Sequence, residues 1–201
     1  VSVQAKTHVD TSLLAEKVYM VPSNDKFSLL VHALKHETPG IAIVFCATRR
    51  SCDKVAKQLR IQKVDATPIH GGLSQSKRIH TINDLHRRGV GGLVATDVAS
   101  RGLHIDNISH VYNYELPQTS DDYTHRIVRT ARAGAKGDAI TMISPPELRD
   151  FKIMIRDLRK EIRQADLPNF EKVVMVQGPA HERSFQEHGG QKKHKRFWKR
   201  R

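Results

Sequence analysis

The sequence predicts an α/β fold, a parallel β-sheet with helices on both faces. Short runs of consecutive apolar residues, the clearest at 41–45, are typical of strands that are covered on both sides. Between these runs, apolar residues recur at helical spacing. Strands and helices that alternate in this way form a parallel sheet, in which ligands bind at the carboxyl ends of the strands.

Five strands are expected, in chain order over 41–45, 66–69, 91–95, 109–114 and 138–143. Four helices are expected from apolar stripes, which are Phe27, Leu30, Val31 and Leu34; Cys52, Val55, Ala56 and Leu59; Ile79, Ile82 and Leu85; and Phe151, Met154, Ile155, Leu158 and Ile162. Ser23 or Asn24 is the expected N-cap of the first helix, and Ser74 that of the third. The range 171–176 is expected to be a short strand or an edge segment.

The composition indicates an intracellular protein that meets a polyanion. The 201 residues carry a net charge of +13 with a pI of about 10.0, which is typical of domains that bind polyanions. No apolar run approaches the roughly 18 residues of a membrane span. The two cysteines, Cys46 and Cys52, fit no zinc or redox motif, so both are expected to be reduced thiols, with Cys46 buried in a strand. The cytoplasm is the expected compartment, with the nucleus or an organelle left open.

Four segments are expected along the chain: a lead-in or linker at 1–14, the folded domain at 15–166, a short extension at 167–180 and a basic tail at 181–201. The tail holds eight Lys or Arg against two Glu. From Gly178 onward the composition predicts disorder. Because the first residue is Val1 and not Met, we expect an excised fragment of a longer protein or a processed terminus.

Hydroxyl groups, glycines and arginines gather just after three of the expected strands. Glycine lets backbone N–H groups approach a phosphate closely, and helix N-termini favour anions. Any one of these loops could be an ordinary helix cap, but three at one edge of a sheet favour a phosphate-binding edge. The residues concerned are Thr48, Arg49, Gly71, Gln75, Thr96 and Asp97.

Three arginines, Arg126, Arg129 and Arg132, recur every third residue. If Asp121 begins a helix, they project from its final turns in related directions. A solvated charged face is the alternative, but such faces normally mix signs, and no acid lies between His125 and the glycine at 137. Fixed, forked guanidinium groups are suited to the charge on a transferring phosphoryl group.

In order and spacing, these residues resemble the second RecA-like domain of DEAD-box ATP-dependent RNA helicases. The resemblance covers roughly residues 15–158, and motifs V and VI together, in register, are its most specific part. The segments that carry it are Phe45 with Thr48 and Arg49 (motif IV), Gln75 with Arg78 (motif IVa), Ala95 to Leu103 (motif V) and His125 to Arg132 (motif VI).

The resemblance implies a role for each of these residues. Arg129 and Arg132 would be arginine fingers that reach the γ-phosphate of ATP, and His125 and Arg126 would link to the acidic motif of a partner domain. The implied ATP contacts are Asp97, His104, Arg129 and Arg132, and the implied RNA-backbone contacts are Thr48, Arg49, Gly71, Gln75 and Thr96. Arg78 is expected to brace the loops. For Arg101, a direct ligand role and a role in shaping its turn remain open.

Three positions depart from the family pattern. Val128 and Ala131 stand where the family usually has Gly, so they either narrow the space beside the fingers or only stiffen the turn. His104 stands where the family usually has an Asp that holds the ATP ribose, and its charge depends on pH. These departures put the detail of nucleotide contact in doubt.

The chain has neither a G-x-x-x-x-G-K-[ST] phosphate loop nor an Asp-Glu-Ala-Asp sequence. ATP and Mg²⁺ are therefore expected to be held mainly by an N-terminal RecA-like domain of the same protein, and this chain alone is expected to be a monomer that hydrolyses ATP negligibly. The alternatives are a non-catalytic RNA-binding module, a DNA helicase or remodeller, and a generic nucleotide-binding domain. The twelve His residues show no metal-ligand spacing, so no metal site is assigned.

The basic tail mixes cations with aromatic residues, among them Lys193, Arg196 and Trp198. Cations bind phosphates and aromatic rings stack on unpaired bases, so an auxiliary RNA tether is expected. A solubility tail, a nuclear import signal or a truncated extension are the alternatives.

Overall fold

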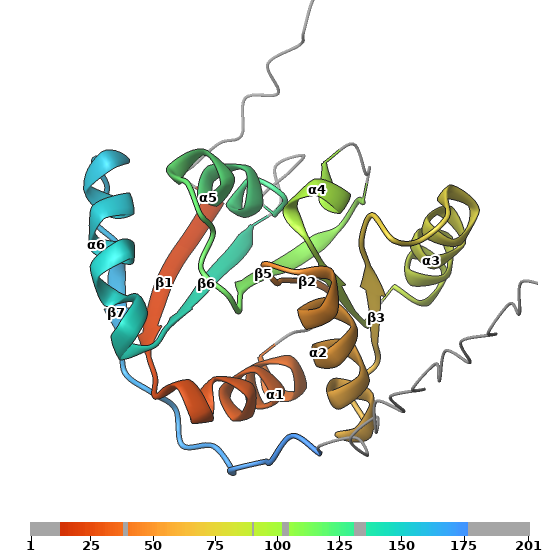
Figure 1. The fold of residues 1–201 in the computed structure, drawn as a ribbon, viewed down its shortest axis with the longest axis horizontal. Coiled ribbons are helices and arrows are strands. Elements are labelled where there is room, and N and C mark those ends of the chain that lie inside the picture. The colour runs from red at the N-terminus through yellow and green to blue at the C-terminus, as the bar shows by residue number, and fades with distance from the viewer. Residues whose placement is uncertain (1–12, 38–39, 90, 102–104, 131–135, 177–201) are drawn as a thin grey trace, which may run out of the picture.

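The fold is a parallel sheet between two layers of helices (Figure 1), which confirms the predicted fold class. The structure is a computed structural model that describes residues 13–37, 40–89, 91–101, 105–130 and 136–176. Within these ranges the sheet has seven strands in the order β3-β4-β2-β5-β6-β1-β7, and every pair is parallel.

The strands are β1 (Leu14–Met20), β2 (Ile41–Phe45), β3 (Ala66–Ile69), β4 (Gly91–Ala95), β5 (Ile108–Asn113), β6 (Gly137–Ile143) and β7 (Arg163–Ala165). The helices are α1 (Lys26–His36), α2 (Arg49–Ile61), α3 (Gln75–Arg88), α4 (Asp97–Ser100), α5 (Ser120–Ile127) and α6 (Leu148–Asp157), with short 3-10 turns at Ser23–Asp25 and Pro145–Glu147. No helix in the described ranges is both long and apolar enough to cross a membrane.

The two helix layers explain why the central strands are uniformly apolar. On β2, Ala42 and Val44 pack against α1 and α2, whereas Ile41, Ile43 and Phe45 face the opposite layer. That layer holds α3, α5 and α6, as Figure 1 shows. Successive side chains of a strand point to opposite faces, so burial on both sides requires apolar residues at every position.

Two strands, β1 and β7, were not predicted. β1 contains Glu16 and Lys17, so it lacks the continuous apolar run that marks β2. The Glu16 carboxylate is satisfied by the hydroxyl of Tyr123 at 2.9 Å, and this partner lies far away in the sequence. Conversely, the range 171–176 is neither a strand nor an edge segment of the sheet.

Helix starts and stripes differ from the prediction in places. Ser74 does cap α3, where it accepts from Lys77 N–H, and Gly89 at φ +69° ends that helix in the left-handed conformation. Both caps predicted for α1 are wrong, because Ser23 and Asn24 lie in the 3-10 turn before the helix and no side-chain cap bond forms. Ile79 is also not part of the core, since 49% of it is exposed.

After β7 the chain crosses α1 and α2 as an extended segment. Ser28 Oγ accepts from Val173 N–H at 3.0 Å and donates to Val173 C=O at 3.2 Å. Gln58 likewise accepts from Val176 N–H through Oε1 at 2.9 Å and donates from Nε2 to Val176 C=O at 2.7 Å. Two buried polar side chains therefore fix the last described residues beside α2.

A partly buried ion pair joins the start of α1 to the turn after β6. Lys26 Nζ lies 3.0 and 2.8 Å from the two carboxylate oxygens of Glu147, and Lys26 is buried. Burial alone raises the pKa of the Glu147 carboxyl, but the hydrogen bonds from Lys26 and Ser144 outweigh burial and hold this pKa below its ordinary value. The pair therefore stabilises the fold when Glu147 is ionised.

We predict that Glu147→Gln lowers the free energy of unfolding at pH 7 by about 1–3 kcal/mol, because Lys26 stays buried without its counter-charge. A depressed carboxyl pKa contributes stability above the ordinary value of 4.5, and this contribution disappears as pH falls through the lower folded value. The difference between parent and variant, measured by urea unfolding, should thus shrink below about pH 4.5. Lys172→Gln, which breaks an exposed pair with Asp25, is the control and should cost under about 0.5 kcal/mol. A difference that does not depend on pH would contradict the assignment.

Candidate nucleotide- and RNA-facing site

The sheet order brings the predicted loops to one edge. β3, β4, β2 and β5 are consecutive neighbours and all point the same way, so the loops after them lie side by side. Thr48, Arg49, Gly71 and Gln75 are exposed in these loops, whereas Thr96 is buried.

Arg126 is the centre of the site, because its guanidinium is buried and bonded on every side. It is 1% exposed. Its Nε and Nη2 donate to the two oxygens of Asp97 at 2.6 and 2.8 Å, and Nη1 donates to Asn113 Oδ1 at 3.1 Å and to Glu115 C=O at 2.7 Å. The guanidinium also lies 4.9 Å from the centre of the Phe45 ring. One side chain thus ties α5 to three strand ends.

The sequence places α5 so that Arg126 faces inward. Thr119 caps the helix and accepts from Asp122 N–H. One turn before Arg126, Tyr123 is fully buried and donates to Glu16 of β1. Burial raises the pKa of the Tyr123 phenol, so this hydroxyl remains a donor over the whole physiological range.

Glu115 joins the same centre to the loop after β2. Its Oε2 accepts from Ala47 N–H and its Oε1 accepts from Ser51 Oγ, both at 2.5 Å. Its carbonyl accepts from Arg126. Thr48, which lies between the two contacts, caps α2 and accepts from Ser51 N–H at 3.0 Å. The position of Thr48 therefore depends on Glu115.

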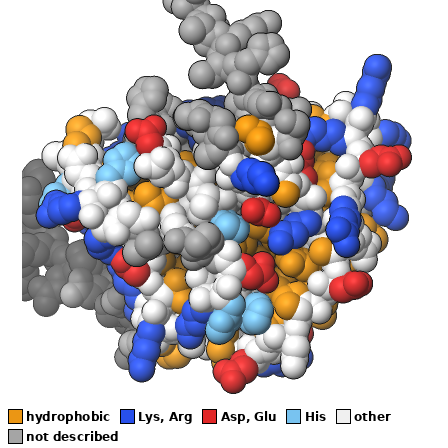
Figure 2. Space-filling view, turned by 180° about the vertical axis from the view of Figure 1, so that it is seen from behind, with side chains coloured by type: hydrophobic (Ala, Val, Ile, Leu, Met, Phe, Trp, Pro, Cys, Tyr) orange, Lys and Arg blue, Asp and Glu red, His pale blue; other side chains and the backbone are white. Residues whose placement is uncertain are grey.

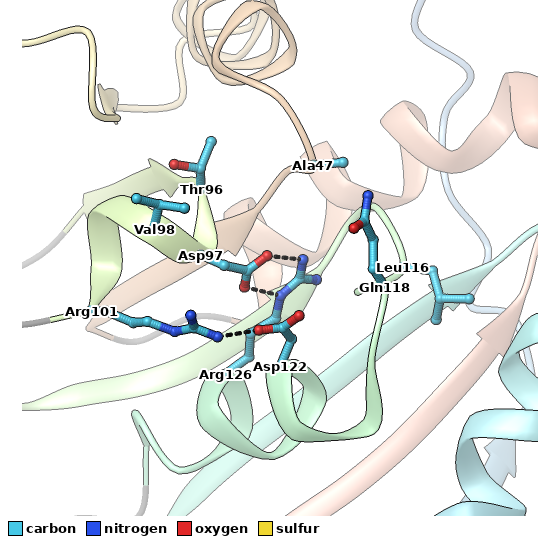
Figure 3. A pocket seen from close by; sticks show the side chains of 9 residues that line it. All are labelled: Ala47, Thr96, Asp97, Val98, Arg101, Leu116, Gln118, Asp122 and Arg126. Atoms are coloured by element: carbon cyan, nitrogen blue, oxygen red, sulfur yellow. Dashed lines mark hydrogen bonds and ion pairs between the residues drawn. The ribbon is translucent and has the colours of Figure 1, made fainter.

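A polar hollow of about 210 Å³ lies between α4 and α5 (Figure 3). Thr96, Asp97, Val98 and Arg101 line one side, with Asp122 and Arg126 opposite. Figure 3 shows the two arginine–aspartate pairs that cross it, Arg126 with Asp97 and Arg101 with Asp122. Because these charges neutralise each other, the hollow alone offers no net charge to a phosphate.

His70 shapes the glycine loop after β3. It is buried, its Nδ1 accepts from Gly72 N–H at 3.2 Å, and its Nε2 lies 3.0 Å from Asp53 of α2. A backbone N–H can only donate, so Nε2 must carry the ring hydrogen that faces Asp53. The Arg49 guanidinium covers the loop, since a Cβ added at Gly71 would lie 3.3 Å from its Nη2. A side chain at Gly71 would therefore require the Arg49 guanidinium to move by a few tenths of an ångström.

Arg78 braces the next connection, as expected. Its Nη1 donates to Gln75 Oε1 at 3.1 Å and its Nη2 donates to Ala99 C=O at 3.0 Å. The first turn of α3 is thereby attached to α4, which carries Asp97. Arg101, at the end of α4, pairs with Asp122 of α5.

The arginine repeat is divided by the end of α5. The Arg126 guanidinium is bonded to partners within this chain, and its expected link to another domain stays a prediction. His125 is exposed on the other side of the helix, and Arg129 is half-buried just beyond its end. Neither lines the hollow.

Several predicted residues fall outside the described ranges: Arg132, Ala131, His104, and Lys193, Arg196 and Trp198 of the tail. Val128 is described, with φ −72° and ψ 2°. A non-glycine residue adopts this conformation without strain, and the side chain packs against the core cluster around α5 and α6. The described residues contain no group of three or more His, Cys, Asp or Glu placed to bind a metal ion.

Sequence reasoning missed two residues that organise the site, Glu115 and His70. Both lie directly after predicted strands, so the rule that pointed to Thr48 and Thr96 also covers them. They differ in that they bind neighbouring loops and do not face outward. The partner of Glu115 is Ala47, 68 residues away, and the partner of His70 is Asp53, 17 residues away. Sequence spacing does not reveal either contact.

Known proteins with similar sequences belong to one family. Residues 25–134 match the model of the helicase conserved C-terminal domain. The ATP-dependent RNA helicase CshA of Listeria monocytogenes is 36% identical over 176 residues, which cover 87% of this chain and 34% of that protein. The DEAD-box ATP-dependent RNA helicase RhpA of Helicobacter pylori is 33% identical over 172 residues, covering 86% of this chain and 35% of the relative. The chain thus spans about a third of the length of these relatives.

Solved structures give the same result. A DEAD box protein from Methanococcus jannaschii superposes with a TM-score of 0.72 at 35% identity, over 78% of this chain and 43% of that one. E. coli SrmB, bound to regulator of ribonuclease activity A, superposes with a TM-score of 0.70 at 35% identity, over 76% of this chain and 89% of that one. S. cerevisiae Dbp5, bound to RNA and ADP BeF3, superposes with a TM-score of 0.68 at 28% identity, over 75% of this chain and 41% of that one.

We predict strong energetic coupling between Arg126 and Asp97. Arg126→Lys cannot make the forked contact and Asp97→Asn leaves a buried cation uncompensated, so each should cost about 2–4 kcal/mol of unfolding free energy. In a double-mutant cycle the double variant should lose at least about 1 kcal/mol less than the sum of the single losses. The matched control is Arg101 with Asp122, a pair in which Arg101 is 53% exposed and for which the coupling should stay below about 1 kcal/mol. Additive losses at Arg126 and Asp97 would contradict the central role of this pair.

Proposed function

Because the chain belongs to the helicase conserved C-terminal domain family, as the counterpart of the second RecA-like domain of DEAD-box RNA helicases, we propose that it is one half of an RNA-stimulated ATPase. Its tasks are to supply arginine fingers to ATP and to hold the RNA backbone. The observation that carries the proposal is the buried Arg126, which joins the helix leading to the fingers to the loops that face RNA.

ATP hydrolysis requires positive charge at the transferring phosphoryl group, and fixed guanidinium groups provide it. Arg129 follows α5 directly, so its place is set by the anchored residues Tyr123 and Arg126. We assign Arg129 and Arg132 as fingers, with His125 facing the partner domain and Arg126 as a positioning residue. ATP and Mg²⁺ are held mainly by an N-terminal RecA-like domain, so this chain alone hydrolyses ATP negligibly.

RNA is held through its sugar-phosphate backbone by the exposed edge of the sheet. Thr48 and Arg49 begin α2, Gly71 lies beneath Arg49, and Gln75 begins α3. Exposed N–H groups at helix starts together with a guanidinium are typical phosphate ligands, and they carry little sequence preference. Asp97 and Thr96 connect this edge to Arg126, and closure of two such domains on one strand would bend it and open a short duplex.

A non-catalytic RNA-binding module is the second candidate, suggested by Val128, Ala131 and His104. The unstrained backbone at Val128 favours the ATPase, because the larger side chain requires no distortion of the turn that precedes Arg129. Val128 is therefore compatible with ATPase activity.

We predict that this chain, mixed with a separately prepared N-terminal RecA-like domain, hydrolyses ATP only when RNA is added. Arg129→Ala should lower this turnover by about 10³-fold or more, because one finger is lost from the transition state. Lys152→Ala on α6 removes an exposed cation far from the loops and should leave the rate unchanged. Turnover without RNA, or turnover that survives Arg129→Ala, would contradict the assignment. No turnover despite RNA binding and domain association would favour the non-catalytic module.

We also predict that His70 positions the RNA-facing glycine loop. His70→Ala removes the acceptor of Gly72 N–H and should weaken RNA binding roughly five- to tenfold, in line with the loss of one buried hydrogen bond. His70→Asn keeps an acceptor near the place of Nδ1 and should restore most of the affinity. His80→Ala, in the exposed part of α3, is the control. If His70→Ala and His80→Ala bind RNA alike while both fold normally, His70 has no positioning role.

A further inference from the structure

The exposed face of α2 carries a row of unneutralised cations. A helix turns by about 100° per residue, which places the exposed positions of α2 on one arc of about 140°. Five of the seven side chains on this arc are basic: Arg49, Arg50, Lys54, Lys57 and Arg60. The other two are Asp53 and Ile61. The buried stripe of Cys52, Val55, Ala56 and Leu59 occupies the opposite side.

Carboxylates do not balance these charges. Among the described residues, none of the five cations has a carboxylate within 4.0 Å, and the single acid of the arc, Asp53, faces His70. Other helices differ: on α3 Asp84 pairs with both His80 and Arg87. Figure 2 shows the molecule from behind, where acidic and basic side chains are interspersed. The exposed face of α2 is therefore predominantly basic and lacks the ion pairs seen on α3, whereas solvated surfaces normally mix signs.

The basic face continues from the proposed RNA-binding loops. Arg49 belongs to both, because it covers the glycine loop after β3 and begins α2. From Arg49 to Arg60 the helix rises about 16 Å, enough to follow several consecutive phosphates. The chain also leaves the described ranges at Val176, which is bonded to Gln58 of α2.

We propose that the α2 face binds the phosphates of RNA that extends beyond the strand held at the sheet edge. This inference rests on the proposed function, since it takes RNA as the ligand of the neighbouring loops. Several cationic side chains along one exposed helix suit the regularly spaced phosphates of a nucleic-acid backbone. The contact adds affinity for longer RNA without sequence preference, and RNA that reaches only the sheet edge does not use it.

The test compares two double variants that each remove two exposed positive charges. Lys54→Gln/Lys57→Gln lies on the α2 face, and Lys152→Gln/Arg156→Gln lies on the exposed side of α6. Binding is measured by fluorescence anisotropy, over a range of salt concentrations, to single-stranded RNAs of about five and about twenty nucleotides. Thermal unfolding establishes that both variants fold like the parent.

The α2 variant should bind the long RNA roughly tenfold more weakly, and its log–log salt dependence should be shallower by about 1.4, or about 0.7 for each of two lost phosphate contacts. The short RNA should bind as it does to the parent, and the α6 variant should match the parent on both. Equal weakening by both variants would show a general charge effect and overturn the proposal. Unchanged binding by the α2 variant would also overturn it, and would leave an acidic protein as the partner of this face.

A further variant separates this inference from the proposed function. Gln75→Ala changes the sheet edge and not the α2 face, so it should weaken the short RNA. If Gln75→Ala has no effect while the α2 variant weakens long RNA, the RNA site at the sheet edge fails and the α2 face stands. If Gln75→Ala weakens binding of the short RNA while the α2 variant has no effect on the long RNA, the proposed RNA site at the sheet edge is supported and the proposed α2 site is contradicted.

Discussion

A buried guanidinium and the carboxylate that compensates it organise this domain. Removing an arginine from water is costly unless its charge is paired and its N–H groups are bonded, so Arg126 requires Asp97 and the oxygens around β5. The pair joins segments that are 29 residues apart in the sequence. Glu115 extends the same network to the loop that begins α2. The strand-end loops are consequently parts of one rigid edge.

This arrangement gives a physical reason for the proposed coupling between RNA and ATP. Thr48, which we propose to face RNA, lies between Ala47 and Ser51, which both donate to the Glu115 carboxylate, and the Glu115 carbonyl accepts from Arg126. Arg129 directly follows Val128, the C-cap residue of α5. A shift of these loops would therefore either move Arg129, the proposed finger, or break bonds to the buried Arg126. Packed networks of this kind favour two discrete arrangements over gradual deformation.

The sequence was most informative where burial dictates residue type. The run at 41–45 could be recognised because both faces of β2 are covered, and the Ser74 cap because its bond is local. β1 could not be recognised, since its Glu16 accepts a hydrogen bond from Tyr123, 107 residues away. The spacing of the arginines suggested that all three project from one helix in related directions. Periodicity does not reveal where a helix ends, and the end of α5 at Ile127 separates the buried Arg126 from those that follow.

A structure of this chain with its N-terminal RecA-like domain, single-stranded RNA and a γ-phosphate analogue with Mg²⁺ would test the account most directly. We expect the Arg129 guanidinium at hydrogen-bond distance from the analogue, about 2.7–3.2 Å, while Arg126 keeps its contacts to Asp97 and the RNA backbone lies against Thr48 and Gln75. An Arg129 side chain directed away from the nucleotide in a closed, RNA-bound complex would contradict the assignment of this domain as the half that supplies the fingers.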